Sequence, residues 1–280
     1  MTKLLGEILA DAKQRIRPVS GSASLDAQLL IAEVLDANRA HVIAHPEKVL
    51  TSKQADQIEQ WVVRREQGEP IAYILGRRAF YDRDFMVTSD VLIPRPETEH
   101  LLEIALEFAE TRTTLVAVDV GTGSGAIAVT FKANVPSAIV YATDISADAL
   151  KVAQRNAVNH RADVEFFQGD LLQPMIDAGT TLDLVMANLP YIETEEMLEL
   201  AVSKYEPRLA LDGGDDGLDL VRRLLKQAEG ICNKDAMILL EIGANQGEKT
   251  RNQAYELLKP ADVSIIQDYA GHDRVIKILL

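Results

Sequence analysis

From Thr113 onward, short apolar runs alternate with stretches that have helical spacing. Continuous apolar runs are typical of strands buried on both faces, and the helical stretches between them are the crossovers that parallel strands require. We predict seven strands here, with the sequences TLVAVDV, AIVYATDI, DVEFFQGD, LDLVMANLP, AMILLEIG, ADVSIIQDY and RVIKILL. The pattern therefore predicts an α/β domain built on a mostly parallel sheet.

Only the residues AGHD separate the last two predicted strands. Because a right-handed crossover needs about a dozen residues, the final strand must run antiparallel to its predecessor. Six parallel strands and one reversed strand at the end describe the class I S-adenosylmethionine-dependent methyltransferase fold, a Rossmann-like fold, better than a nicotinamide dehydrogenase. We predict this fold for residues 95–280.

Residues 1–76 carry helical signals and almost no strand signals. Apolar residues recur at helical spacing in residues 4–9, 26–38 and 52–68. We therefore predict a small helical-bundle domain over residues 1–76 and assign it to substrate recognition.

Two features delimit the third of these helices and the end of the helical domain. Thr51 followed by Gln54 fits a capping box, and Gly68 fits the helix stop. Residues 77–94 then change to aromatic and β-branched residues broken by a polar turn, so we predict a β-hairpin linker there.

A glycine-rich turn follows the first predicted strand of the α/β domain. It reads Asp119-Val120-Gly121-Thr122-Gly123-Ser124-Gly125 and leads into a helical stretch. Alternate glycines let a backbone turn tightly and approach a ligand closely, although such a turn can also bind nothing. We predict that residues 121–125 hold a cofactor, whereas Asp119 either contacts the cofactor's amino group or braces the loop.

Acidic side chains end the next two predicted strands. Asp144 ends the second strand, where a carboxylate can accept hydrogen bonds from both hydroxyls of an adenosine ribose. Asp170 ends the third strand in the same way and could meet the adenine amino group. Because open α/β sheets bind ligands at this edge, the two carboxylates and the glycine loop predict an adenosine-type cofactor.

The fourth predicted strand ends in Asn188-Leu189-Pro190-Tyr191. The Asn188 side-chain carbonyl and the backbone carbonyl of residue 189, held extended by Pro190, are two acceptors that can be aimed at one NH2 group. The ring of Tyr191 can pack on a planar group. An amide nitrogen is a poor nucleophile, but two acceptors can draw off proton charge while the methyl carbon is approached in line. We predict methyl transfer to a planar amide-like nitrogen at residues 188–191.

Composition limits the partners and the location. A formal net charge of -14 argues against long stretches of nucleic acid as a partner, because phosphate binding depends on Lys and Arg. No segment approaches the roughly 18 apolar residues of a membrane span, and the N-terminal segment lacks the apolar core of a signal peptide. We therefore predict a cytoplasmic protein without a membrane partner. The single cysteine, Cys232, excludes a cysteine cage, and we predict no metal.

Blocks along nearly the whole chain resemble the HemK/PrmC family of peptide chain release factor glutamine methyltransferases. They are the helical N-terminal region, GEPIAYILGRRAFY at 68–81, LIPRPETE at 92–99, DVGTGSG at 119–125, NLPY at 188–191 and EPRLALDGGDDGLD at 206–219. The combination of LIPRPETE with EPRLALDGGDDGLD is specific to that family, whereas the glycine loop is not.

The resemblance implies N5-methylation of the glutamine in the Gly-Gly-Gln motif of peptide chain release factors. It implies S-adenosyl-L-methionine as cofactor and a release factor as protein partner. It also implies that residues 188–191 bind the glutamine and that segment 95–99 lies near the cofactor. The implied cofactor-binding residues are Gly121, Thr122, Gly123, Ser124, Gly125, Asp144, Asp170, Leu171 and Asn188.

One position departs from the family pattern, because the usual block is NPPY and this chain has Leu189. The block NLPY is also similar to that of the rRNA adenine dimethyltransferases. An adenine-N6 methyltransferase acting on RNA or DNA, which would have to expose or flip a base, is therefore the alternative. A third hypothesis is a catalytically silent binding protein, against which the intact glycine loop and Asn188 argue. The acidic charge and the family blocks favour glutamine methylation without a stable nucleic-acid partner.

Overall fold

The computed structural model describes residues 3–200 and 204–280. The chain divides into two compact units, Met1–Arg77 and Arg78–Leu280. Each unit has its own buried core. The assignment of substrate recognition to the first unit stays a prediction.

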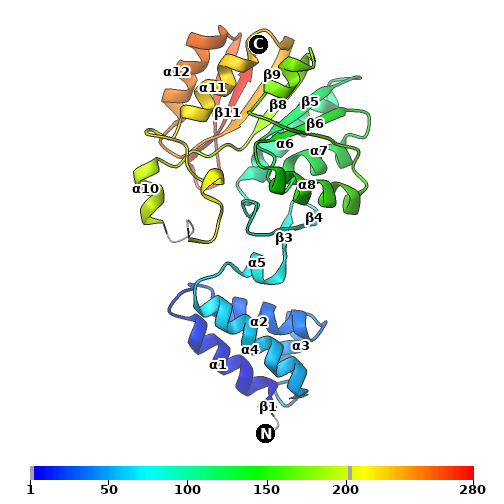
Figure 1. The fold of residues 1–280 in the computed structure, drawn as a ribbon, viewed down its shortest axis with the longest axis vertical. Coiled ribbons are helices and arrows are strands. Elements are labelled where there is room, and N and C mark those ends of the chain that lie inside the picture. The colour runs from blue at the N-terminus through cyan, green and yellow to red at the C-terminus, as the bar shows by residue number, and fades with distance from the viewer. Residues whose placement is uncertain (1–2, 201–203) are drawn as a thin grey trace. The chain divides into compact units, whose positions relative to one another are not determined.

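The smaller unit is a bundle of helices around an aliphatic core (Figure 1). Its elements are α1 (Leu5–Ile16), α2 (Ala23–Val34), α3 (Arg39–Ala44), α4 (Ser52–Glu66), α5 (Ile71–Leu75) and the short antiparallel pair β1 (Lys3–Leu4) and β2 (Val49–Leu50). The predicted capping box is confirmed, since the Thr51 hydroxyl accepts from the Gln54 N–H and the Gln54 side chain accepts from the Thr51 N–H.

A β-hairpin begins the larger unit. Its strands are β3 (Arg77–Phe80) and β4 (Arg83–Met86), so it is shorter than the hairpin predicted over 77–94. After Met86 the chain continues without strand pairing, because Thr88 and Asp90 close a side-chain-to-backbone turn. Phe80 and Phe85 are fully buried in the core of the larger unit, which anchors the hairpin there.

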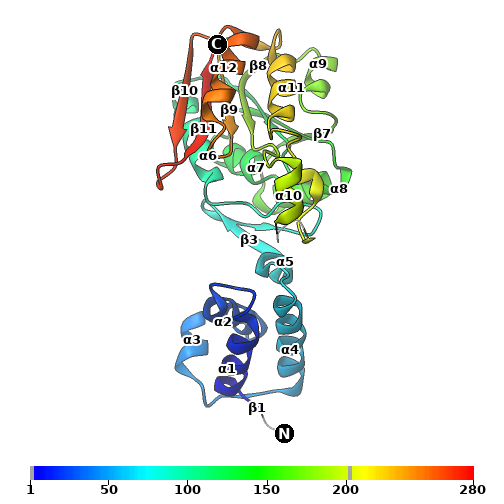
Figure 2. The ribbon, with the colours of Figure 1, turned by 90° about the vertical axis from the view of Figure 1, so that its left-hand side faces the viewer.

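The larger unit contains a seven-stranded sheet with the order β10-β11-β9-β8-β5-β6-β7. β10 and β11 lie together at one edge of this sheet (Figure 2). The strands are β5 (Val116–Val120), β6 (Ile139–Asp144), β7 (Glu165–Gln168), β8 (Leu182–Ala187), β9 (Cys232–Glu241), β10 (Asp262–Gln267) and β11 (Asp273–Leu279). β11 pairs antiparallel with both β10 and β9, whereas β9, β8, β5, β6 and β7 pair in parallel. The predicted seven strands and the single reversed strand are confirmed.

Helices cover both faces of the sheet (Figure 1). One face carries α6 (Thr98–Glu110), α7 (Ala126–Asn134) and α8 (Ala147–His160), and the other carries α9 (Gln173–Asp177), α11 (Asp219–Ala228) and α12 (Gly247–Leu258). Between β8 and α11 lie α10 (Thr194–Glu199) and a 3-10 turn (Arg208–Ala210). Neighbouring residues of one strand enter different cores: Ala117 packs with α6 and α7, and Val118 packs with α11.

No helix in the described part of the chain is both long enough and apolar enough to cross a membrane.

Candidate active site

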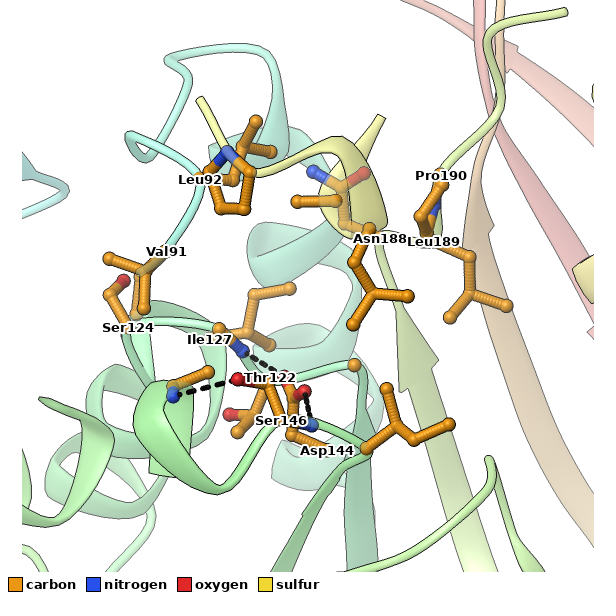
Figure 3. Close-up of a pocket in the computed structure, with 18 of the residues that line it drawn as sticks. Val91, Leu92, Thr122, Ser124, Ile127, Asp144, Ser146, Asn188, Leu189 and Pro190 are labelled. Atoms are coloured by element: carbon orange, nitrogen blue, oxygen red, sulfur yellow. Dashed lines mark hydrogen bonds between the residues drawn. The ribbon is translucent and has the colours of Figure 1, made fainter. Parts of the chain in front are cut away.

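A cavity of about 250 Å³ opens in the larger unit at the carboxyl ends of β5, β6, β7 and β8. Figure 3 shows Val91 and Leu92 on one side of it and Asn188, Leu189 and Pro190 on another, with Asp144 below them. This edge is where open parallel sheets bind ligands. The sheet therefore brings the predicted site segments to one place.

The glycine loop follows β5 and is fixed by the strand beside it. The N–H groups of Gly121 and Thr122 both donate to the Thr143 carbonyl of β6, at 2.9 and 3.0 Å. Gly121 and Gly123 have φ values of +71° and +55°, which favour glycine, and both line the cavity. The loop thus presents bare backbone to a ligand.

Asp119 lies beneath this loop and is buried. Its Oδ2 accepts from the Thr122 hydroxyl at 2.6 Å and from the Ala128 N–H at 3.1 Å. Burial raises the pKa of Asp119 to about 7, although these two hydrogen bonds oppose the shift. Of the two roles considered for Asp119, its contacts fit the bracing of the loop.

Asp144 ends β6, and its carboxylate lines the cavity. One oxygen accepts from the Gly123 N–H at 2.9 Å, and the other accepts from the Ser146 N–H at 2.8 Å (Figure 3). Burial raises the pKa of Asp144, and these backbone hydrogen bonds limit the rise. Because a carboxylate oxygen has two lone pairs, each oxygen keeps one for a hydroxyl of a ligand.

Asp170 and Leu171 follow β7, and both line the cavity. Asp170 is not an isolated carboxylate, because it forms an ion pair with Arg223 of α11, which also lines the cavity. Leu171 is buried and holds a left-handed backbone conformation with φ +53°. The contact with Arg223 bridges 53 positions of sequence, so no local pattern could predict it.

The residues that directly follow β8 form another wall of the cavity. Asn188, Leu189 and Pro190 all line the cavity. The Asn188 Nδ2 donates to the Thr98 hydroxyl oxygen at 2.9 Å, which leaves the side-chain oxygen of Asn188 as an acceptor. Leu189 is buried, and its Cδ2 would lie 3.1 Å from a Cβ placed on Gly121, so its side chain packs against the glycine loop.

Two predicted residues do not line the cavity. Gly125, with φ +81°, begins α7 where that helix packs on α8, and a Cβ there would lie 3.1 Å from the Cβ of Ala153. Tyr191 is not among the residues that line the cavity, and its carbonyl accepts from the Gln246 side chain at 2.8 Å. Burial and the nearby Glu241 raise the pKa of Tyr191 to about 12, so its phenol stays neutral at physiological pH. The predicted packing of the Tyr191 ring on a planar substrate stays a prediction.

The remaining predicted residues all line the cavity: Gly121, Thr122, Gly123, Ser124, Asp144, Asp170, Leu171, Asn188, Leu189 and Pro190. Segment 95–99, which the resemblance placed near the cofactor, contributes Arg95 and Thr98 to the lining.

Sequence reasoning missed an apolar wall of the cavity. Val91, Leu92 and Pro94 form it together with Ile127 of α7. The segment that holds Val91 is tied down by Arg95, which donates to both carboxylate oxygens of the buried Glu206, at 2.8 and 2.6 Å. Arg95 and Glu206 belong to the two blocks most specific to the resembled family, which was the signal that could have indicated this contact.

The arrangement fits a nucleoside ligand. Acceptors at Asp144 and Asp170 suit ribose and base donors, and the apolar wall at Val91 and Leu92 suits a planar base. No group of three His, Cys, Asp or Glu side chains within residues 3–200 and 204–280 could hold a metal ion. The donors and acceptors of the cavity fit an adenosine-type cofactor.

Two family models match the chain. The PrmC N-terminal domain matches residues 7–76, and the methyltransferase small domain matches residues 98–205. Among solved structures, a methyltransferase from Pyrococcus furiosus shares the fold with a TM-score of 0.53 and 18% identity, over 79% of this chain and 96% of that one. A Thermus thermophilus 16S rRNA methyltransferase in complex with AdoMet and guanosine has a TM-score of 0.52 and 12% identity, over 72% and 49% of the two chains.

Curated relatives are more similar. The release factor glutamine methyltransferase of Moorella thermoacetica is 41% identical over 253 residues, which are 89% of this chain and 89% of that one. The enzyme of the same name from Bacillus subtilis is 39% identical over 260 residues, 91% and 90% of the two chains. Identity at this level over nearly the whole length, in both units, confirms the resemblance: the chain belongs to the family of release factor glutamine methyltransferases.

Proposed function

We propose that this protein transfers a methyl group from S-adenosylmethionine to the side-chain nitrogen of the glutamine in the Gly-Gly-Gln motif of a peptide chain release factor. The observation that carries the proposal is the pair of acceptors after β8. The Asn188 side-chain oxygen and the main-chain carbonyl of Leu189 belong to residues that line the cavity at the cofactor edge of the sheet. Two adjacent acceptors suit one NH2 group.

The cofactor would be held by residues from three strand ends. Asp144 would accept the two ribose hydroxyls, because each of its oxygens is already oriented by one backbone N–H. The glycine loop would approach the cofactor through its backbone at residues 121–123. The apolar wall at Val91, Leu92 and Ile127 would exclude water from the adenine. Asp170, oriented by Arg223, would meet the adenine amino group.

S-adenosylmethionine supplies an electrophilic methyl carbon on a sulfonium. The protein must hold a weakly nucleophilic amide nitrogen in line with that carbon, which is a task of positioning. Asn188 and the carbonyl of Leu189 would accept the two amide hydrogens and fix the plane of the amide. As the new N–C bond formed, the bond between the methyl carbon and the sulfonium would break and its electron pair would stay on sulfur as a neutral thioether. Positive charge would grow on the nitrogen, and the two acceptors would stabilise it before a proton left to solvent.

The other assignments follow from this function. The helical unit, Met1–Arg77, would dock the release factor, and the reaction would take place in the cytoplasm, where translation occurs. A net charge of -14 supports a protein substrate over a stable nucleic-acid partner. The adenine-N6 alternative receives no support from the curated relatives, which are release factor glutamine methyltransferases.

The test is a labelling assay with the methyl-radiolabelled cofactor. The protein is incubated in parallel with a release factor, with the same factor after replacement of the Gly-Gly-Gln glutamine by alanine, and with ribosomal RNA. Label is expected on the unaltered release factor alone. Label on ribosomal RNA would support the adenine alternative, and label on the alanine variant would reject the proposed glutamine as the acceptor.

A further inference from the structure

Three neighbouring polar side chains, those of Asn188, Thr98 and Glu241, lead from the lining of the cavity to a buried carboxylate. The Asn188 Nδ2 donates to Thr98 Oγ1 at 2.9 Å, and the Thr98 hydroxyl lies near enough to the Glu241 carboxylate to lower its pKa as a hydrogen-bond donor. Thr98 is 4% exposed and Glu241 is 2% exposed. Three elements meet here: Thr98 begins α6, Asn188 follows β8, and Glu241 ends β9.

The sheet places Asn188 and Glu241 beside each other. β8 and β9 are parallel neighbours, and Ala187 is paired with Leu240. The next residue of each strand is therefore Asn188 on one and Glu241 on the other. Thr98 bridges their side chains from the first turn of α6, so the link depends on the fold and not on local sequence.

The hydrogen bonding has a direction when Glu241 is ionised, which it is above its pKa of about 7. An ionised carboxylate only accepts, so Thr98 then donates its single hydroxyl hydrogen to Glu241. The Thr98 oxygen is then left only as an acceptor, and the Asn188 group that faces it must be the NH2. The oxygen and the NH2 of an amide have nearly the same size, so hydrogen bonding is what decides which of them faces Thr98.

The neighbours of Glu241 favour its ionised form, whereas its burial opposes ionisation. Burial raises the pKa of Glu241 to about 7, while the nearby Arg274 and Arg95 favour its ionised form and Glu97 opposes it. Tyr191 also lies close enough to interact electrostatically with this carboxylate. One oxygen, Oε2, has no hydrogen-bond partner among the described residues. A buried carboxylate without a donor has a high free-energy cost, so the hydrogen bond from Thr98 to Glu241 is strongly favoured.

We propose that Thr98 and Glu241 are positioning residues that hold the Asn188 amide with its oxygen available to the substrate. The inference rests on the proposed function, since it assigns the acceptor of the substrate NH2 to that oxygen. A reversed Asn188 amide would present NH2 to the substrate NH2, and two donors repel each other. Thr98 and Glu241 therefore affect the chemical step only through Asn188.

The first test compares kcat of Thr98→Val and Thr98→Ser for release factor methylation at saturating S-adenosylmethionine and at about pH 8.5, where Glu241 is ionised. Valine keeps the shape of threonine and removes the hydroxyl, so kcat is expected to fall roughly 10- to 100-fold, as for a displaced reacting group. Serine keeps the hydroxyl and is expected to restore most of kcat. Because Thr98 lines the cavity, calorimetry accompanies the assay, and the dissociation constant for S-adenosylmethionine is expected to change less than about threefold.

Thr250→Val is the matched control. Thr250 lies in α12, is fully buried, and its hydroxyl has no hydrogen-bond partner in the described part of the chain. The substitution removes the same atom from an equally buried site, and kcat is expected to stay within about twofold of wild type. Equal kcat for Thr98→Val and wild type, or for Thr98→Val and Thr98→Ser, would overturn the inference.

A double-mutant cycle separates positioning from a general structural effect. In an Asn188→Ala background no amide is left to orient, so adding Thr98→Val is expected to lower kcat no further than about twofold. A fall by the same factor in both backgrounds would show that Thr98 acts independently of Asn188 and would overturn the inference. If the wild type labelled no release factor glutamine, the proposed function would fail instead, so the two failures are distinguishable.

Discussion

Replacement of Asp144 by asparagine removes one acceptor without changing the shape of the side chain. In the wild type, the two oxygens of Asp144 accept the N–H groups of Gly123 and Ser146 and line the cavity. In the variant, one oxygen becomes an NH2 group, and the backbone N–H that faces it loses its acceptor. The same substitution removes one acceptor and the negative charge from the predicted ribose site.

The two consequences have different sizes and different readouts. The unpaired backbone N–H costs about 1–3 kcal/mol in the free energy of unfolding, with or without the cofactor. The loss of affinity comes from the ribose contacts, where a hydrogen bond to a charged group is worth about 1.5–3 kcal/mol. We therefore expect the dissociation constant for S-adenosylmethionine to rise roughly 10- to 150-fold.

Isothermal titration calorimetry measures the affinity, and urea unfolding measures the stability. Asp183→Asn is the matched control, because the Asp183 oxygens accept from the Val116 N–H and the Asn233 side chain, both at 2.8 Å, and Asp183 does not line the cavity. The control is expected to lose stability and to keep its affinity for the cofactor. Equal affinities for Asp144→Asn and wild type would refute the assignment of Asp144 to the ribose.

Two further predictions concern the residues around the glycine loop. Leu189→Pro keeps the main-chain carbonyl at residue 189, so release factor methylation is expected within about threefold of wild type. Loss of the buried leucine packing is expected to lower the free energy of unfolding by about 1–2 kcal/mol. Activity below a tenth of wild type would contradict the proposed role of that carbonyl. Burial raises the folded-state pKa of Asp119 from 3.8 to about 7, so the native state binds the carboxyl proton more tightly than the unfolded chain does. The stability that Asp119 contributes is therefore present below about pH 4 and is lost as the pH rises through 7. Urea unfolding between pH 4 and pH 8 should therefore show the stability of wild type relative to Asp119→Asn falling across that window, and a constant difference would contradict the raised pKa.

The sequence was most informative where structure is dictated by local pattern. The seven strands could be predicted because strands buried on both faces are continuous apolar runs, and the reversed strand because AGHD is too short for a crossover. Asp144 and Asn188 could be placed at one edge because both directly follow a parallel strand.

Features that depend on long-range packing could not be read in this way. The hairpin was predicted too long because residues 87–94 have strand composition but no pairing partner, and pairing is a tertiary property. Tyr191 directly follows Pro190, which lines the cavity, but Tyr191 does not line it, and this difference between neighbours depends on packing. The contacts of Asp170 with Arg223 and of Asn188 with Thr98 join residues 53 and 90 positions apart, which no spacing rule addresses.

The position of β11 in the sheet has a consequence for the order of folding. β11 follows β10 in the chain but lies between β10 and β9, so β10 reaches the rest of the sheet only through β11. Until β11 is in place, β9 presents an unpaired edge with the buried residues Ile238, Leu239 and Leu240, and such edges promote aggregation. We infer that the β10–β11 hairpin adds to β9 as a unit and that chains lacking this hairpin aggregate through β9.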